Sequence, residues 1–158
     1  MPGRHSAALL VYRTDAAEGL SVFIGHMGGP FWRNRHQRAW SIPKGEFDPD
    51  EEEPRAAADR EFREEIGVAP PPGVREDLGV FTQRGGKHVH VFAVAGPASL
   101  AFVASNSFTM QWPPGSGRMA QFPEVDRAGW YSLHDARELV VAGQVAALDA
   151  LADQRAGS

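Results

Sequence analysis

The chain has 158 residues and no cysteine. Without thiols it can form no disulfide, no thiolate nucleophile and no zinc–sulfur site. Long hydrophobic runs are also missing: the first apolar stretch, Ala7–Tyr12, is too short for a secretory signal, and no later stretch could cross a bilayer. These absences predict a cytoplasmic protein that has no membrane partner.

Positive charge is not in excess either, since the formal net charge is −4. A nucleic-acid partner would require a basic surface, so we expect none. A small phosphorylated ligand, held by a few local cations and metal ions, remains compatible with this charge. With 42% hydrophobic and 23% charged residues, the composition is that of a globular protein. The length predicts a single domain over residues 1–158.

The periodicity of apolar residues, interrupted by glycine and proline, predicts an α/β (α+β) fold. We expect strands at Ser6–Tyr12, Leu20–Gly25, Trp40–Ile42, Leu78–Gln83, Lys87–Ala95, Phe108–Trp112 and Trp130–Tyr131. We expect helices at Glu53–Ile66, Leu133–Val141 and Gln144–Asp153. Pro54 suits the first turn of the first helix, and Gly67 suits the position just past its end.

Ten of the twenty acidic residues fall between Glu46 and Glu65. Within the expected helix, offsets of three and four place Glu61, Glu64 and Glu65 on one face. Their mutual repulsion, and their position at the negative end of the helix dipole, cost stability unless a cation lies over them. Hard divalent cations prefer such oxygen ligands. The alternative interpretation is a solvated acidic face, partly neutralised by Arg60 and Arg63.

The segment Gly45–Val68 resembles the Nudix box. Glu52 is followed, after seven residues, by Arg-Glu-Phe-Arg-Glu-Glu-Ile-Gly-Val, which matches every defined position of that half of the box. The lead-in Trp40–Gly45 is also similar to that of the family. Gly45 and Glu52 are separated by six residues where the family pattern has five. We place the extra residue before the helix, because an insertion within it would rotate the carboxylates by roughly 100°.

The resemblance implies a Nudix-type α/β/α sandwich with a central mixed sheet and a catalytic helix over about Glu53–Ile66. It implies Mg²⁺, with Mn²⁺ as a possible substitute, held by Glu61, Glu64, Glu65 and the backbone carbonyl of Lys44.

In the same family pattern, Arg60 pairs with box carboxylates, in the first place Glu52, while Gly45 and Gly67 support the motif. The general base varies among family members, and both Glu61 and Glu124 remain candidates. Glu124 could also be an ordinary loop acid.

Substrate contacts are expected at Arg84 and Lys87, which flank the turn at Gly85–Gly86. Here the chain resembles diadenosine-polyphosphate hydrolases, in which basic residues of this region meet the polyphosphate; exposed hairpin cations are the alternative. Four aromatic residues could stack on a base or simply pack in the core or loops: Phe31, Trp32, Trp40 and Trp112. The segment Phe108–Gly117 matches no family motif.

The resemblance therefore predicts an enzyme that hydrolyses a phosphoanhydride bond in a nucleoside diphosphate derivative. A dinucleoside polyphosphate or a nucleoside triphosphate is the expected small-molecule substrate. The alternatives are a clean-up enzyme for oxidised nucleoside triphosphates and a Nudix-fold module that senses a nucleotide without cleaving it. A homodimer is possible, although no sequence feature marks its interface.

Overall fold

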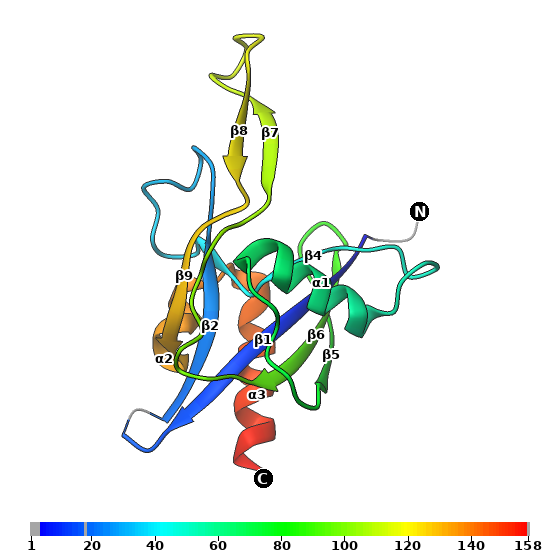
Figure 1. Ribbon diagram of the computed structural model, residues 1–158, viewed down its shortest axis with the longest axis vertical. Helices are drawn as coiled ribbons and strands as arrows, with labels where there is room; N and C mark the ends of the chain where they lie inside the picture. Colours follow the sequence, from blue (N-terminus) through cyan, green and yellow to red (C-terminus); the bar gives the residue numbers. More distant parts are fainter. Residues whose placement is uncertain (1–3, 18, 158) are drawn as a thin grey trace.

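The computed structural model describes residues 4–17 and 19–157, and a mixed β-sheet lies at its centre (Figure 1). Seven strands form this sheet: β1 (His5–Asp15), β2 (Gly19–Met27), β3 (Trp40–Ser41), β4 (Lys44–Glu46), β5 (Glu76–Thr82), β6 (His88–Ala95) and β9 (Val125–Ser132). The order β3-β2-β1-β6-β5 is completed by β4, which pairs with β1, and by β9, which pairs with β2. Among the pairs of strands that the structure describes in this sheet, β1 and β6 are parallel and the others are antiparallel.

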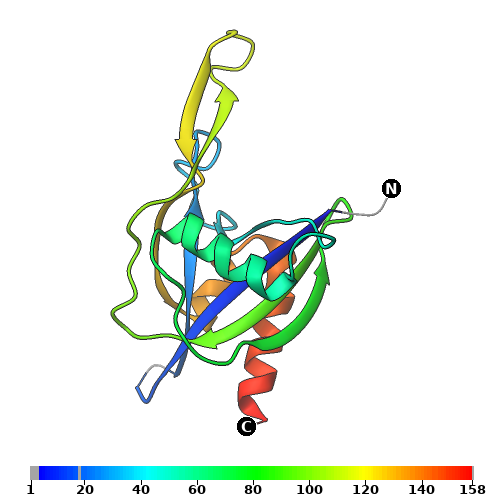
Figure 2. The same cartoon turned by 45° about the vertical axis from the view of Figure 1, so that its right-hand side comes forward.

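Helices cover both faces of the sheet (Figures 1 and 2). The helix α1 (Pro54–Ile66) packs on one face, and α2 (Leu133–Leu139) and α3 (Val145–Ala156) pack on the other, with a short 3₁₀ helix at Ala142–Gln144 before α3. Alternate residues of β1 pack toward α1 and toward α2 and α3, so that both faces of the strand are buried. This arrangement confirms the predicted α/β/α sandwich and explains why the β1 sequence is continuously apolar.

The helix α1 begins and ends where the sequence predicts. Pro54 is its first residue, preceded by Glu53 as the N-cap, and Gly67 closes it in the left-handed region at φ +85°. A Cβ at Gly67 would also collide with the backbone of Ala104. Both the positive φ and the lack of space therefore require glycine at this position. Phe62 and Ile66 are fully buried against the sheet.

Several strand and helix boundaries differ from the predictions. β4 is not predicted, because Lys44–Glu46 is polar and becomes a strand only by pairing with β1. β9 begins at Val125 rather than at Trp130, since nearly its whole length pairs with β2. The helix expected over Leu133–Val141 ends at Leu139, where the chain turns extended at Val140. Tertiary pairing overrides local propensity at these positions.

A hairpin of β7 (Ser107–Gln111) and β8 (Met119–Pro123) projects away from the main body (Figures 1 and 2). β7 is close to the predicted strand, whereas β8 is not predicted. At the base of the hairpin, Phe108 pairs with Phe122, with ring centroids 6.0 Å apart, and packs over Gly29. The hairpin thus places an aromatic side chain against the loop that follows β2.

None of the helices that the structure describes has the length and apolar composition needed to span a bilayer.

The buried side chain of Gln144 fixes the segment that leads into β4. Its Oε1 accepts a hydrogen bond of 2.8 Å from the backbone N of Ile42, and its Nε2 donates one of 2.8 Å to Ser41 Oγ. We expect Gln144→Ala to lower the free energy of unfolding by about 2 kcal/mol, because a buried N–H loses its acceptor. Chemical denaturation measures this change. The exposed Gln37→Ala is the control; an equal loss in both variants would contradict the assigned role.

Candidate active site

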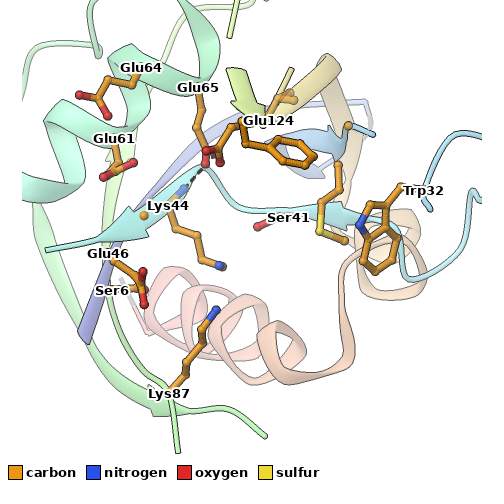
Figure 3. A pocket seen from close by; sticks show the side chains of 15 residues that line it. Ser6, Trp32, Ser41, Lys44, Glu46, Glu61, Glu64, Glu65, Lys87 and Glu124 are labelled. Atoms are coloured by element: carbon orange, nitrogen blue, oxygen red, sulfur yellow. Dashed lines mark hydrogen bonds between the residues drawn. The ribbon is translucent and has the colours of Figure 1, made fainter. Parts of the chain in front are cut away.

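A pocket of about 420 Å³ opens between the C-terminal half of α1, the start of β1, β4 and the turn between β8 and β9 (Figure 3). Carboxylates line one part of it: Glu46, Glu61, Glu64, Glu65 and Glu124. Lys44 and Lys87 line a second part, and Met27, Trp32, Phe108 and Val125 provide an apolar part. Residues from seven regions of the chain therefore meet in one cavity.

Two of the helix carboxylates, those of Glu61 and Glu65, are buried in this pocket. Glu65 accepts a hydrogen bond of 3.2 Å from the backbone N of Lys44, and burial raises its pKa to about 8. Burial also raises the pKa of Glu61, against the opposing effect of Arg60. Both shifts have the direction expected for carboxylates removed from water, so a cation that stabilises the charged form has a place here.

Arg60 ties together three of the box carboxylates. Its Nε and Nη2 donate to the two oxygens of Glu52, both at 2.9 Å, and its Nη1 donates to Glu61 at 2.8 Å and to Glu64 at 3.2 Å. These hydrogen bonds lower the pKa of Glu52. The predicted Arg60–Glu52 pair is thus present, and its bidentate form fixes the orientation of both groups.

The extra residue of the box lies outside the helix. The backbone N atoms of Glu51 and Glu52 both donate to the Asp48 carbonyl at 3.0 Å, which closes a turn before Pro54. A turn can absorb an additional residue without changing the direction of side chains on the following helix. The three helical glutamates consequently keep the spacing of the family pattern.

Gly45 has no room for a side chain. A Cβ built at this position would overlap the carboxylate of Glu61. Gly45 is paired with Ala7 in the β1–β4 ladder, so the strand cannot retreat without breaking that pairing. The close approach of β4 to α1 therefore explains the glycine that the motif places here.

The donors of the pocket suit a hard divalent cation. Carboxylate oxygens dominate, and no thiolate is available because the chain has no cysteine. Over residues 4–17 and 19–157, however, no three acidic or histidine side chains converge closely enough to form a complete ligand set. Arg60 occupies oxygens of Glu61 and Glu64, while Glu65 faces the Lys44 amide. Binding a metal would require these contacts to rearrange.

Glu124 lies in the pocket between β8 and β9. Its backbone is fixed on both sides, because its N donates to Asn106 O at 2.7 Å and its O accepts from Gly28 N at 2.9 Å. Its negative charge contributes to the raised pKa values of Glu61 and Glu65. The sequence candidate from the later loop is thus brought beside the carboxylates of α1.

Of the residues expected to contact the substrate, some line the pocket and others do not. Lys87 lines the pocket, whereas Arg84 is exposed on the turn and does not line it, because the turn between β5 and β6 directs the two cations differently. Among the aromatic candidates, Trp32 lines the pocket and Trp40 is buried in the core. Phe31 and Trp112 contact each other edge to face instead, with centroids 5.5 Å apart.

Seven other lining residues have no role in the predictions from sequence: Ser6, Met27, Gly28, Ser41, Glu46, Phe108 and Val125. Ser41 and Glu46 lie within Trp40–Val68, the stretch that is similar to the family, and the other five belong to no motif. Contacts between segments that are distant in the sequence bring all seven into the pocket. Phe108 falls in the segment that matches no family pattern, so no sequence signal marked it.

The NUDIX domain family model matches residues 3–151 of the chain. A search of curated protein sequences found no match to this chain. Among solved structures, an Ap4A hydrolase of C. elegans in a binary complex is 19% identical with a TM-score of 0.64, covering 97% of this chain and 99% of that chain. A mutT/nudix family protein from Listeria innocua is 16% identical with a TM-score of 0.62, and the match covers 99% of this chain and 96% of that chain.

The NUDIX domain of NrtR from Shewanella oneidensis, complexed with ADP ribose, is 16% identical with a TM-score of 0.60, covering 98% of this chain and 89% of that chain. At these identities the three structures show a common fold, and they agree with the sandwich described above.

The contact between Gly45 and Glu61 can be tested by a double-mutant cycle. We expect Gly45→Ala to lower the free energy of unfolding by about 2 kcal/mol, because the new methyl group displaces the Glu61 carboxylate. Combined with Glu61→Ala, the loss should be at least about 1 kcal/mol smaller than the sum of the single losses. Gly129→Ala, whose Cβ would meet only Tyr131 at 3.8 Å, is the control. Strict additivity would refute the contact.

Proposed function

Because the chain belongs to the Nudix family of pyrophosphohydrolases, we propose that it uses a divalent metal ion to hydrolyse a phosphoanhydride bond of a nucleoside diphosphate derivative. One observation carries the proposal: two carboxylates from one turn of α1, Glu61 and Glu65, are buried in a pocket that also has a cationic part and an apolar part. A phosphorylated ligand with an apolar moiety matches that division.

The metal ligands in this proposal are the side chains of Glu61, Glu64 and Glu65 and the backbone carbonyl of Lys44. The ion we propose is Mg²⁺, for which Mn²⁺ can substitute. When bound, such an ion neutralises phosphate oxygens and lowers the pKa of an attacking water molecule. Arg60 would remain anchored by its bidentate pair with Glu52, while its hydrogen bonds to Glu61 and Glu64 would give way as those carboxylates bind the ion.

The reaction requires a base that takes a proton from water as its oxygen bonds to phosphorus. Glu61 and Glu124 are the two candidates, and both lie in the pocket. The phosphoanhydride bond then breaks, and its bridging oxygen leaves with one product. The products are a nucleoside monophosphate and the remaining phosphorylated fragment.

The apolar part of the pocket supports a nucleoside as the second portion of the substrate. Trp32 and Phe108 border the same turn, because the backbone N of Trp32 donates to Gly29 O at 3.3 Å and Phe108 packs over Gly29. Trp32 lies at the opposite end of the pocket from Glu61 and Glu64 (Figure 3). Aromatic faces bind bases by stacking, which tolerates different bases. We propose a nucleoside triphosphate or a dinucleoside polyphosphate as the substrate.

Replacement of the helix carboxylates tests the reaction. Glu61→Gln and Glu65→Gln should each lower kcat with Mg²⁺ by about 100-fold or more, because each removes charge from the metal ligands. The measurement is release of monophosphate and pyrophosphate from a panel of nucleoside triphosphates, dinucleoside polyphosphates and ADP-ribose, with chelator as a blank. Glu138→Gln, on the exposed face of α2, is the matched control. Near-normal turnover by both variants, or no hydrolysis of any member by the wild type, would reject the proposal.

The apolar part of the pocket has its own test. Trp32→Ala and Phe108→Ala should each raise KM for a nucleotide by about 5- to 100-fold, since stacking on a base contributes about 1–3 kcal/mol. Steady-state kinetics at several substrate concentrations separates KM from kcat. Phe31→Ala, which removes a ring outside the pocket lining, should leave both parameters unchanged. If the Phe31 variant behaved like the other two, the base would not bind at this end.

A further inference from the structure

His26 is a polar residue near the end of β2 that is 0% exposed. Its ring has a polar partner on each side: Nδ1 lies 2.8 Å from Asp126 Oδ1, and Nε2 lies 2.7 Å from the carbonyl oxygen of Arg35. Because a carbonyl oxygen can only accept a hydrogen bond, Nε2 is the donor to Arg35. Burial of an imidazole is costly unless its nitrogens find partners, and here both do. His26 therefore joins the sheet to a residue of the following loop.

That loop connects β2 to β3 over residues 28–39 and lies beside the base of the β7–β8 hairpin (Figure 1). It contains no helix or strand, and most of its side chains are exposed. Its ends are held together by a backbone hydrogen bond of 2.9 Å from Met27 N to Ala39 O. A loop with few buried contacts is mobile unless its middle is also fixed. The hydrogen bond from His26 to Arg35 fixes it at a point between the two ends.

Arg35 connects this anchor to Trp32, an aromatic residue of the loop that lines the pocket. The backbone N of Arg35 donates to Trp32 O at 3.0 Å, and the Arg35 guanidinium lies over the indole, 5.7 Å from the ring centroid. Arg35 thus contacts His26 through its carbonyl, and Trp32 through its amide and its side chain. The position of the indole in the pocket therefore depends on a buried residue that does not itself line the pocket.

Two further contacts fix the orientation of the imidazole ring. Asp126, in β9, is itself close to a second charge, because Arg127 Nη1 lies 3.6 Å from the same carboxylate oxygen that faces His26. The Trp40 ring meets the imidazole edge to face, with centroids 5.3 Å apart. A side chain that is both packed and hydrogen-bonded keeps one rotamer, so Nε2 stays directed at the loop.

We infer that His26 is a positioning residue for nucleotide binding: through Arg35 it holds Trp32 in the orientation in which the indole stacks on the base. The inference rests on the proposed function, which places the nucleoside against Trp32. The α1 carboxylates lie at the opposite end of the pocket from Trp32 (Figure 3). Loss of the anchor should therefore raise KM and leave kcat nearly unchanged, as expected when binding is weakened equally in the ground state and the transition state.

Two polar replacements of His26 separate its two hydrogen bonds. A glutamine amide can place a donor near the position of Nε2, whereas the shorter asparagine amide reaches only the position of Nδ1. His26→Gln should keep KM within about twofold of the wild type, while His26→Asn should raise KM about fivefold or more, the value of one hydrogen bond. Steady-state kinetics uses the nucleoside triphosphate or dinucleoside polyphosphate that the wild type hydrolyses with the highest kcat/KM. Equal KM values in the two variants, or a larger increase in His26→Gln, would overturn the inference.

A double-mutant cycle tests whether His26 acts through Trp32. In the Trp32→Ala background, His26→Asn should change KM by less than about twofold, because the side chain that it positions is absent. In the Phe31→Ala background, which removes an exposed ring of the same loop, the full effect of His26→Asn should persist. If the effects of His26→Asn and Trp32→Ala simply multiply, His26 does not act through Trp32.

Fluorine NMR observes the indole without catalysis. The chain has four tryptophans, which can be labelled with fluorotryptophan, and Trp32→Phe assigns one of the signals. The Trp32 signal should shift or broaden in His26→Asn and match the wild type in His26→Gln, while the signal of Trp130 stays unchanged and reports an intact fold. If His26→Asn does not fold, Asp126→Ala replaces it, because this side chain is 28% exposed and its loss releases the ring. An unchanged Trp32 signal in the folded variant would overturn the inference.

The two experiments together separate the positioning from the proposed function. If the Trp32 signal depends on the Nε2 donor but no nucleotide is cleaved, the positioning of the loop stands and the hydrolytic function fails. If nucleotides are cleaved but His26→Asn and His26→Gln have the same KM and the same Trp32 signal, the positioning is wrong and the function stands.

Discussion

The organisation of the pocket depends on the contact between one turn of α1 and the backbone of β4. Glu65 accepts a hydrogen bond from the Lys44 amide, and Glu61 lies against the α-carbon of Gly45. This contact removes two carboxylates from water and raises their pKa values. Phe62 fixes the helix from the opposite side by packing into the core of the sheet. Carboxylates held in this manner favour whatever cation can restore their charge.

The rest of the fold gathers complementary groups around that contact. β1 carries Ser6 into the pocket, the turn before β6 carries Lys87, and the hairpin of β7 and β8 carries Phe108. Each comes from a different part of the chain, and each adds a distinct property: a hydroxyl, a positive charge or an apolar surface. The resulting cavity is acidic beside α1, contains the ammonium groups of Lys44 and Lys87 beside β4, and is apolar beside the loop that contains Trp32.

The sequence predicted the parts of this arrangement that are local. Helical spacing placed the three glutamates on one turn, and Pro54 and Gly67 marked the ends of the helix. The strands with strong apolar patterns were also predicted. Features that arise from pairing between distant segments were not, and these include β4, β8 and most of β9.

The same limit applies to individual site residues. Lys87 and Arg84 are equivalent in sequence, as cations beside one turn, yet only Lys87 lines the pocket. Ser6 looks like an ordinary strand residue until the register with β4 and the absence of a hydrogen-bond partner for its hydroxyl are known.

The anomalous diffraction of a crystal soaked in Mn²⁺ and a non-hydrolysable nucleotide would test the central claim most directly. The account predicts a peak in contact with Glu61 and Glu65; nucleotide bound in the pocket with no peak beside these residues would contradict it.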